Sequence, residues 1–185
     1  ETVQETGGGV CQGSSTVYLA ALRSNLEIVE RYPHGYITRY VPDGMDATVY
    51  YGAKDFRFRN NTPFPIQVVG SVSGRSLTVS ILGTKSDNIT VEMTNQTVGT
   101  TGYKTVYKVD SSLPAGSTRV SVTPYAGYTV KVYRNLYENG KLKDTKLEST
   151  SVYRSRDKVV LVSPEDAAQY GLLSLIHISE PTRPY

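Results

Sequence analysis

The sequence predicts an α+β domain, with one main helix on an antiparallel sheet, followed by a small, elongated all-β domain. A single helical pattern occurs, directly after Cys11. Beyond it the chain alternates between short runs rich in Val, Ile, Thr and Tyr and turns rich in Gly, Pro and Asn. The 15 tyrosines, with no tryptophan, suit strands that have one solvated face. We therefore expect a helix packed on a sheet first and only strands afterwards.

The predicted helix follows the cysteine, in "QGSSTVYLAALRSNLEI". Val17, Ala20, Ala21 and Leu22 recur at helical spacing, and the hydroxyl of Ser14 or Ser15 is expected to cap the first turn. Cys11 then lies at or just before the N-terminus of the helix.

Six β-rich runs follow the helix, separated by turn residues. They are residues 26–32, 36–41, 47–51, 55–60, 66–72 and 76–82. The small and polar segment "GTKSDN" then interrupts the pattern and predicts a boundary near residue 85, with one domain over 1–84 and a second over 85–165.

The second domain is predicted to contain strands only. Tyr128, Val130, Val132 and Tyr133 are typical strand residues, and "ENGK" at 138–141 is a strong Asn-Gly hairpin signal. Few aliphatic core positions and long polar strands favour an extended module over a compact enzyme.

Residues 166–185 form a predicted tail, and residues 173–185 within it are predicted to have a different origin. "LSLIHISEPTR" at 173–183 shows neither strand alternation nor a helical stripe, and a common transposase-type sequencing adapter encodes it in frame. Residues 173–185 are therefore set aside as an artefact. Because His177 falls in this tail, Cys11 and His34 are the only cysteine and histidine of the natural part.

Composition excludes several classes of protein. The net charge of +3 is spread along the chain without a basic run, which argues against nucleic-acid binding. No stretch approaches about twenty apolar residues, and the chain begins at Glu1 without a signal-like run, so any membrane anchor is expected upstream of an N-terminally truncated fragment. One cysteine excludes an intramolecular disulfide and fits an exported Gram-positive protein.

From Gly7 to Ile66 the sequence closely resembles the VanW family. The resemblance rests on the glycine triplet with Cys-Gln, the Ser-Ser-Thr helix start, Glu-Arg followed by Pro-His, Tyr-Val-Pro, Asp-Ala-Thr-Val, and Asp-Phe-Arg-Phe with Asn-Asn-Thr-Pro. It implies an exported or membrane-anchored protein of Gram-positive bacteria, in a family named after an accessory gene of some glycopeptide-resistance clusters. Gly13 and Gly35 depart from the family pattern, which commonly has a branched apolar residue and a serine there.

The remainder resembles the G5 domain of cell-surface proteins, chiefly in "YAGYTVKVYRNLYENGKL". This resemblance implies an affinity for N-acetylglucosamine-containing glycans. Both halves predict an extracellular or envelope-associated protein whose partner is peptidoglycan or another cell-wall glycan.

Cys11 supports an enzymatic hypothesis. The free N–H groups and macrodipole of a helix N-terminus stabilise a thiolate, which can attack a carbonyl carbon. Gln12 would bind the developing oxyanion, His34 would act as base and Asp46 would orient His34. A protein with these residue roles would be a cysteine-dependent hydrolase or acyl transferase acting on peptidoglycan.

A structural interpretation competes with each of these roles. Free cysteines are often buried, His34 in a loop can be an ordinary hydrogen-bonding residue, and Asp46 can be a turn or capping residue. A metal site is disfavoured because paired Cys or His ligands are missing, and no cofactor is expected.

Tyrosines of the second domain are the candidate glycan-binding residues, because sugar rings stack on aromatic faces. The candidates are Tyr103, Tyr107, Tyr128 and Tyr133. Cross-strand tyrosine pairs also stabilise sheets, so this pattern allows both interpretations. Two hypotheses result: a glycan-interacting scaffold or accessory module, and a cysteine-dependent envelope enzyme. The oligomeric state is left open.

Overall fold

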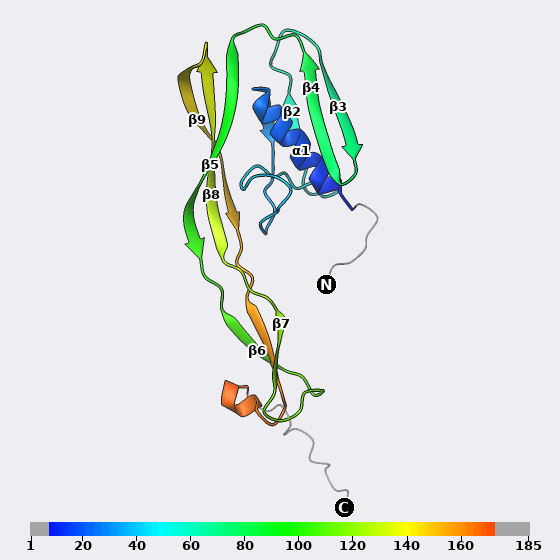
Figure 1. Cartoon of the computed structure of the whole chain (residues 1–185), viewed down its shortest axis with the longest axis vertical. Helices are drawn as coiled ribbons and strands as arrows, with labels where there is room; N and C mark the ends of the chain where they lie inside the picture. The colour runs from blue at the N-terminus through cyan, green and yellow to red at the C-terminus, as the bar shows by residue number, and fades with distance from the viewer. Residues whose placement is uncertain (1–7, 173–185) are drawn as a thin grey trace, which may run out of the picture. The chain divides into compact units, whose positions relative to one another are not determined.

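The computed structural model describes residues 8–172, which contain one α-helix, ten strands and one short 3-10 helix (Figure 1). The predicted fold class, a helix with antiparallel strands followed by strands alone, is confirmed. Gly7 and the adapter-like segment 173–185 lie outside the described residues.

Helix α1 (Val10–Arg23) begins after Gly9, whose φ of 92° places it in the left-handed region that glycine tolerates. The predicted serine cap is wrong, because the hydroxyls of Ser14 and Ser15 donate instead to the backbone oxygens of Cys11 and Ala47. These bonds tie the first turns of α1 to the segment that contains Asp46.

Four short strands flank the helix. β1 (Glu27–Glu30) pairs with β2 (Arg57–Arg59), and β3 (Ile66–Ser73) pairs with β4 (Ser76–Gly83), both antiparallel. Figure 1 shows α1 beside the β3–β4 hairpin, and α1 contacts β4 and β1. The buried face of α1 presents Ser15, Tyr18, Ala21 and Leu22, and Tyr18 and Leu22 pack with Ala47, Ile28, Phe56 and Met93.

Two predicted strands are not formed. Residues 36–41 and most of 47–51 are irregular, with only a bridge from Tyr50 to Lys54. Neither run has a partner strand among the described residues. Side chains take up backbone groups of residues 44–47 between them, because Arg31 donates to the backbone oxygens of Gly44 and Asp46 and hydroxyls accept the N–H groups of Gly44 and Ala47.

A three-stranded sheet has the order β5 (Ile89–Thr101), β8 (Gly127–Glu138), β9 (Lys141–Tyr153). The predicted Asn-Gly hairpin is confirmed between β8 and β9, where Asn139 and Gly140 have φ of 51° and 77°. Along β8 the side chains of Val130, Val132 and Arg134 are buried in alternation.

The chain forms two compact units. Among the described residues, the first comprises 8–100 together with Tyr128–Arg154, and the second comprises Thr101–Gly127 together with 155–172. The boundaries of these compact units differ from the predicted domain boundaries, 1–84 and 85–165. The two predicted domains therefore stay a prediction.

In the second unit, β10 (Lys158–Val162) lies between β6 (Thr105–Val109), to which it is parallel, and β7 (Thr118–Val122), to which it is antiparallel. The 3-10 helix η1 (Ala167–Tyr170) follows β10 and contacts β6.

Candidate functional site

The centre of the candidate site is the buried carboxylate of Asp46, which is 1% exposed. One oxygen accepts hydrogen bonds from the guanidinium of Arg31, at 3.0 Å, and from the hydroxyl of Tyr153. The other oxygen accepts the backbone N–H of His34 at 2.7 Å and contacts its Nδ1 at 2.6 Å. Arg31 also donates to the hydroxyl of Ser151. Four groups from three residues therefore converge on one carboxylate.

These partners keep Asp46 ionised. Burial by itself would raise the pKa of Asp46, but the hydrogen bonds from His34 and Tyr153 and the charge of Arg31 lower that pKa to about 2. Burial and the neighbouring Asp46 carboxylate raise the pKa of Tyr153, which remains a neutral hydrogen-bond donor at physiological pH.

Asp46 also sets the tautomer of His34. Because an ionised carboxylate can only accept, the Nδ1 of His34 carries the proton in this contact. In the neutral ring the Nε2 atom is then the acceptor, and it lies 3.1 Å from the hydroxyl of Tyr40. The structure thus brings together His34 and Asp46, in the geometry of a base and its orienting carboxylate.

The hydroxyl of Tyr40 contacts His34 of this pair. Burial raises the pKa of the Tyr40 hydroxyl, and electrostatic interactions with Cys11 and Asp46 act in the same direction, whereas hydrogen bonds to Ser15 and Thr38 act against them. Cys11 is half-buried in the first turn of α1, and its sulfur contacts the backbone oxygen of Val49 at 3.5 Å. The hydroxyl of Tyr40, and not the sulfur of Cys11, therefore contacts the Nε2 of His34.

Gln12, Gly13 and Gly35 are the remaining residues that the sequence analysis singled out near this site. Gln12 lines a shallow hollow together with Tyr40, and its side chain makes no hydrogen bond with another residue of the described chain. The backbone at Gly13 and Gly35 has open space where a Cβ would stand, so these departures from the family pattern leave His34 and Asp46 in place.

The four tyrosines predicted to bind glycan are divided between the two compact units, and their role stays a prediction. Tyr103 is about half exposed, and Tyr107 packs on Tyr170 with ring centroids 4.6 Å apart, both in the second unit. Tyr128 and Tyr133 belong to the first unit, and their odd spacing along β8 puts them on opposite faces of the strand.

A different pair of tyrosines stands out in the first unit. Tyr50 is 71% exposed and Tyr51 is fully exposed, on a turn closed by backbone hydrogen bonds from Ala53 and Lys54 to Tyr50. A hollow of about 670 Å³ lies beside them, lined also by Val10 and Lys54. Val10, which lines this hollow, directly precedes Cys11, and the backbone oxygen of Val49, directly before Tyr50, accepts the contact from the Cys11 sulfur. This aromatic turn therefore lies next to the candidate site.

Sequence reasoning missed Arg31, Tyr40 and Tyr153 as members of the site. The first two lie in the family motifs Glu-Arg and Tyr-Val-Pro, so the motif residues themselves carried a signal. Tyr153 is 107 positions from Asp46 in the sequence, and no local pattern links them.

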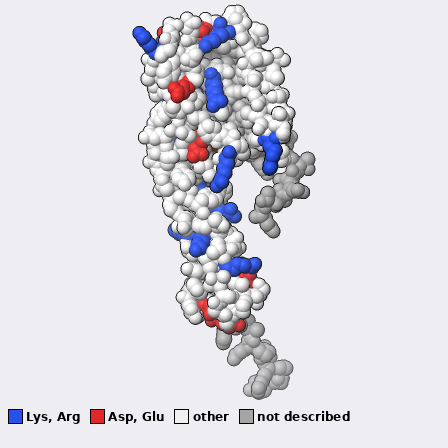
Figure 2. Space-filling model, viewed as in Figure 1, with Lys and Arg blue, Asp and Glu red and all other residues white. Residues whose placement is uncertain are grey.

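In the part of the chain that covers residues 8–172, no three His, Cys, Asp or Glu side chains lie together as metal ligands do. None of its helices has the length and apolar character needed to cross a bilayer. On the face shown in Figure 2, lysine and arginine side chains are scattered, with acidic residues among them.

Comparison with known proteins identifies relatives of each half. An uncharacterized protein of Bacillus subtilis (strain 168), YoaR, is 43% identical over 81 residues, which is 44% of this chain and 27% of YoaR. The solved structure of HP0197-G5 is 24% identical, covers 40% of this chain and 97% of that one, and gives a TM-score of 0.24. The IgA1 protease G5 domain is 16% identical over 42% of this chain and 94% of its own, with a TM-score of 0.29.

Two family descriptions match consecutive parts of the sequence. Residues 1–82 match the VanW-like proteins, and residues 88–164 match the G5 domain. The two domain types together indicate a protein associated with the cell wall. The chain is therefore a VanW-family segment followed by a G5 domain.

Proposed function

We propose that the protein binds peptidoglycan as a scaffold or accessory module of the cell envelope. The observation that carries the proposal is the exposed aromatic turn at Tyr50 and Tyr51, beside a hollow. Exposed aromatic rings on a hydrogen-bonded turn offer faces on which sugar rings stack, and the phenol hydroxyls can bond to sugar hydroxyl and acetamide groups.

The charge near the turn is compatible with a wall polymer. Arg57 is paired with Glu30 and Asp55, whereas Lys54 forms no ion pair with any residue in the described part of the chain. Lys54 is therefore available to a carboxylate of the wall while the tyrosines contact sugar rings.

The test is co-sedimentation with insoluble, purified Gram-positive peptidoglycan. We expect the wild-type chain to sediment and the double variant Tyr50→Ala, Tyr51→Ala to bind about tenfold more weakly, since aromatic contacts contribute about 0.5–1.5 kcal/mol each. Val72→Ala, which shortens a side chain that is 74% exposed on β3, is the matched control. Tyr103→Ala tests whether the second unit contributes. Sedimentation that is absent, or unchanged in the double variant, would contradict the proposal.

A second candidate function is the cysteine-dependent enzyme, which the His34–Asp46 pair favours. In that reaction Cys11 would attack an amide carbonyl and release an amine, which takes a proton from His34, and water would then hydrolyse the thioester. Tyr40 would have to leave the Nε2 of His34 before this nitrogen could act on the thiol.

Alkylation of Cys11 separates this candidate from a structural role. If His34 activates the thiol, His34→Ala slows labelling by iodoacetamide in the folded protein, and Tyr40→Phe, which frees Nε2, accelerates it. Labelling that occurs only after unfolding, or at equal rates in all three proteins, would make Cys11 a structural residue.

A further inference from the structure

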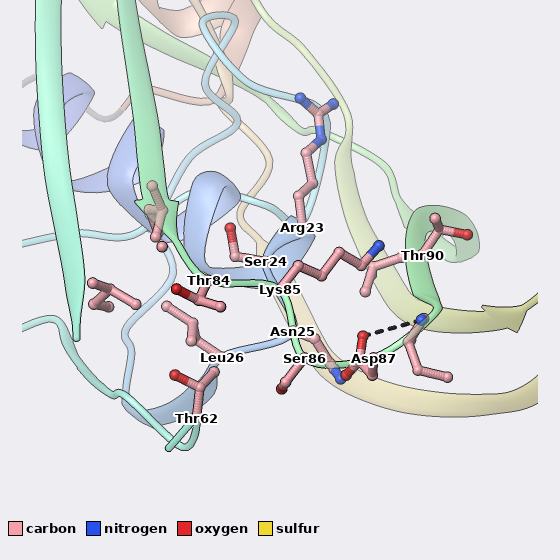
Figure 3. Close-up of a pocket in the computed structure, with 15 residues that line it drawn as sticks. Arg23, Ser24, Asn25, Leu26, Thr62, Thr84, Lys85, Ser86, Asp87 and Thr90 are labelled. Carbon is pink, nitrogen blue, oxygen red and sulfur yellow. Dashed lines mark hydrogen bonds between the residues drawn. The ribbon is translucent and has the colours of Figure 1, made fainter. Parts of the chain in front are cut away.

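A separate hollow of about 400 Å³ lies at the other end of α1, where the helix ends and the chain passes from β4 to β5 (Figure 3). All of its lining residues belong to the first compact unit. Its apolar lining is aliphatic, without any aromatic ring: Leu26, Ile66, Ile81, Ile89 and Val91. A ligand with small aliphatic groups fits such a lining better than a sugar that needs a stacking platform.

Polar groups surround the aliphatic lining. The hydroxyls of Ser24, Thr84, Ser86 and Thr90 line the hollow, whereas the Thr62 hydroxyl already donates to Asn60 and Phe64 and the side-chain oxygen of Asn25 accepts from Arg134. Groups of this kind can bond to peptide N–H and C=O groups.

The charges of the hollow favour an anion. Arg23 and Lys85 are exposed, and within residues 8–172 neither forms an ion pair. Figure 3 shows Lys85 extending from the segment after β4 toward Thr90. The carboxylate of Asp87, the single acidic group in the lining, already accepts the backbone N–H of Ile89 at 3.0 Å. The lining therefore carries two unpaired cations against one carboxylate that is hydrogen-bonded.

The negative end of the helix dipole is partly neutralised at this point. The backbone N–H groups of Ser24, Asn25 and Leu26 already donate to the last carbonyls of α1 at 3.0–3.1 Å. An anion held by Lys85 would meet few free carbonyl oxygens here.

We propose that this hollow binds the free carboxyl end of a short aliphatic peptide, with the carboxylate on Lys85 and the side chains on the isoleucines. The inference rests on the proposed function for the source of such a peptide, which would be the stem peptide of peptidoglycan. It assigns that peptide to a site distinct from the aromatic turn at Tyr50 and Tyr51.

The test is an NMR titration of the full chain with N-acetyl-dialanine, in its L and D forms, against the same compounds with a C-terminal carboxamide. We expect shifts at Thr84–Thr90 with the free acid of at least one form, and binding at least fivefold weaker with the carboxamide. Lys85→Gln should weaken binding at least fivefold, whereas Arg75→Gln, which removes an exposed cation of the β3–β4 turn, should leave it unchanged. Thr84→Trp, at the exposed rim, should fill the hollow and abolish binding.

Three outcomes would overturn the inference: no shift with either free acid, equal binding of acid and carboxamide, or inorganic phosphate binding as tightly as the dipeptide. Wild-type co-sedimentation with peptidoglycan, measured in parallel, separates the two proposals. Sedimentation without dipeptide binding would reject this site alone, and dipeptide binding without sedimentation would reject the proposed function alone.

Discussion

Asp46 is the residue on which the first unit depends most visibly, because its buried charge is compensated by Arg31, His34 and Tyr153 at once. Replacing a partner of a buried ion pair leaves the other charge unpaired, which costs about 3–5 kcal/mol. Asp46→Asn would leave the guanidinium of Arg31, whose side chain is 6% exposed, without its charged partner.

The pH dependence of stability follows from the same carboxylate. The pKa of Asp46 is lowered from 3.8 to about 2 in the folded protein, so its ionisation stabilises the fold above pH 4. As the pH falls from about 4 to about 2, about 2 kcal/mol of unfolding free energy should be lost. Urea unfolding at a series of pH values measures this loss.

Asp46→Asn should unfold at lower urea concentration and lose this part of the acid dependence. Asp43→Asn is the control, since the Asp43 carboxylate makes no hydrogen bond or ion pair within residues 8–172. An Asp46→Asn protein as stable as the wild type would show that the network does not hold the fold together.

Single residues differed in how far the sequence revealed them. The assignment of Asp46 as the orienter of His34 used only the types and order of residues, and the two groups do meet. The position of Tyr40 on the Nε2 of His34 depends on how the loop after His34 folds back, and no periodicity encodes such a path. The same holds for Tyr153, which reaches Asp46 from a strand far along the chain.

Among elements, those with local signals were predicted well. The helix after Cys11 and the Asn139–Gly140 hairpin follow from spacing and from backbone preferences of neighbouring residues. Residues 36–41 and 47–51 have strand-forming composition but form no regular strand, because they have no partner strand among the described residues. β propensity alone could not reveal that, since it depends on what a strand packs against.

The contact between the Asp46 loop and β8 supplies a prediction at this scale. Gly44 has a φ of 83°, and a Cβ there would stand 2.5 Å from the Cγ2 of Val132. Gly44→Ala should therefore combine backbone strain with a clash in the core and lower the unfolding free energy by about 2–4 kcal/mol.

Gly52→Ala is a matched control for the Gly44 substitution. Gly52 also has a positive φ, of 75°, but open space surrounds its Cα. Its substitution should cost only the backbone strain, about 1 kcal/mol. Equal melting temperatures for the two variants would mean that the loop does not press on β8 as described.

At the scale of the whole molecule, the first compact unit draws on both family segments. Val130, Val132, Ser151 and Tyr153 lie within the G5 match, yet they pack with or bond to residues of the VanW match. Arg134 adds a buried ion pair with Glu148 and donates to the backbone oxygen of Leu26. The candidate site of the VanW segment therefore includes groups from beyond residue 85.

This arrangement predicts how shortened chains behave. A chain ending at Thr84 lacks β5, β8 and β9, so Arg31 loses Ser151, Asp46 loses Tyr153, the backbone oxygen of Leu26 loses Arg134, and Tyr18 and Leu22 lose Met93. It should fail to fold, with narrow amide NMR dispersion, because buried polar groups without their hydrogen-bond partners add to the loss of apolar burial. A chain ending at Arg154 keeps all of these contacts and should show dispersed resonances for the first unit. It loses β10, the strand between β6 and β7, so residues 101–127 should give resonances typical of unfolded chain. A cooperative thermal transition in the chain ending at Thr84 would show instead that the VanW segment folds alone, with β8 and β9 added to a site already formed.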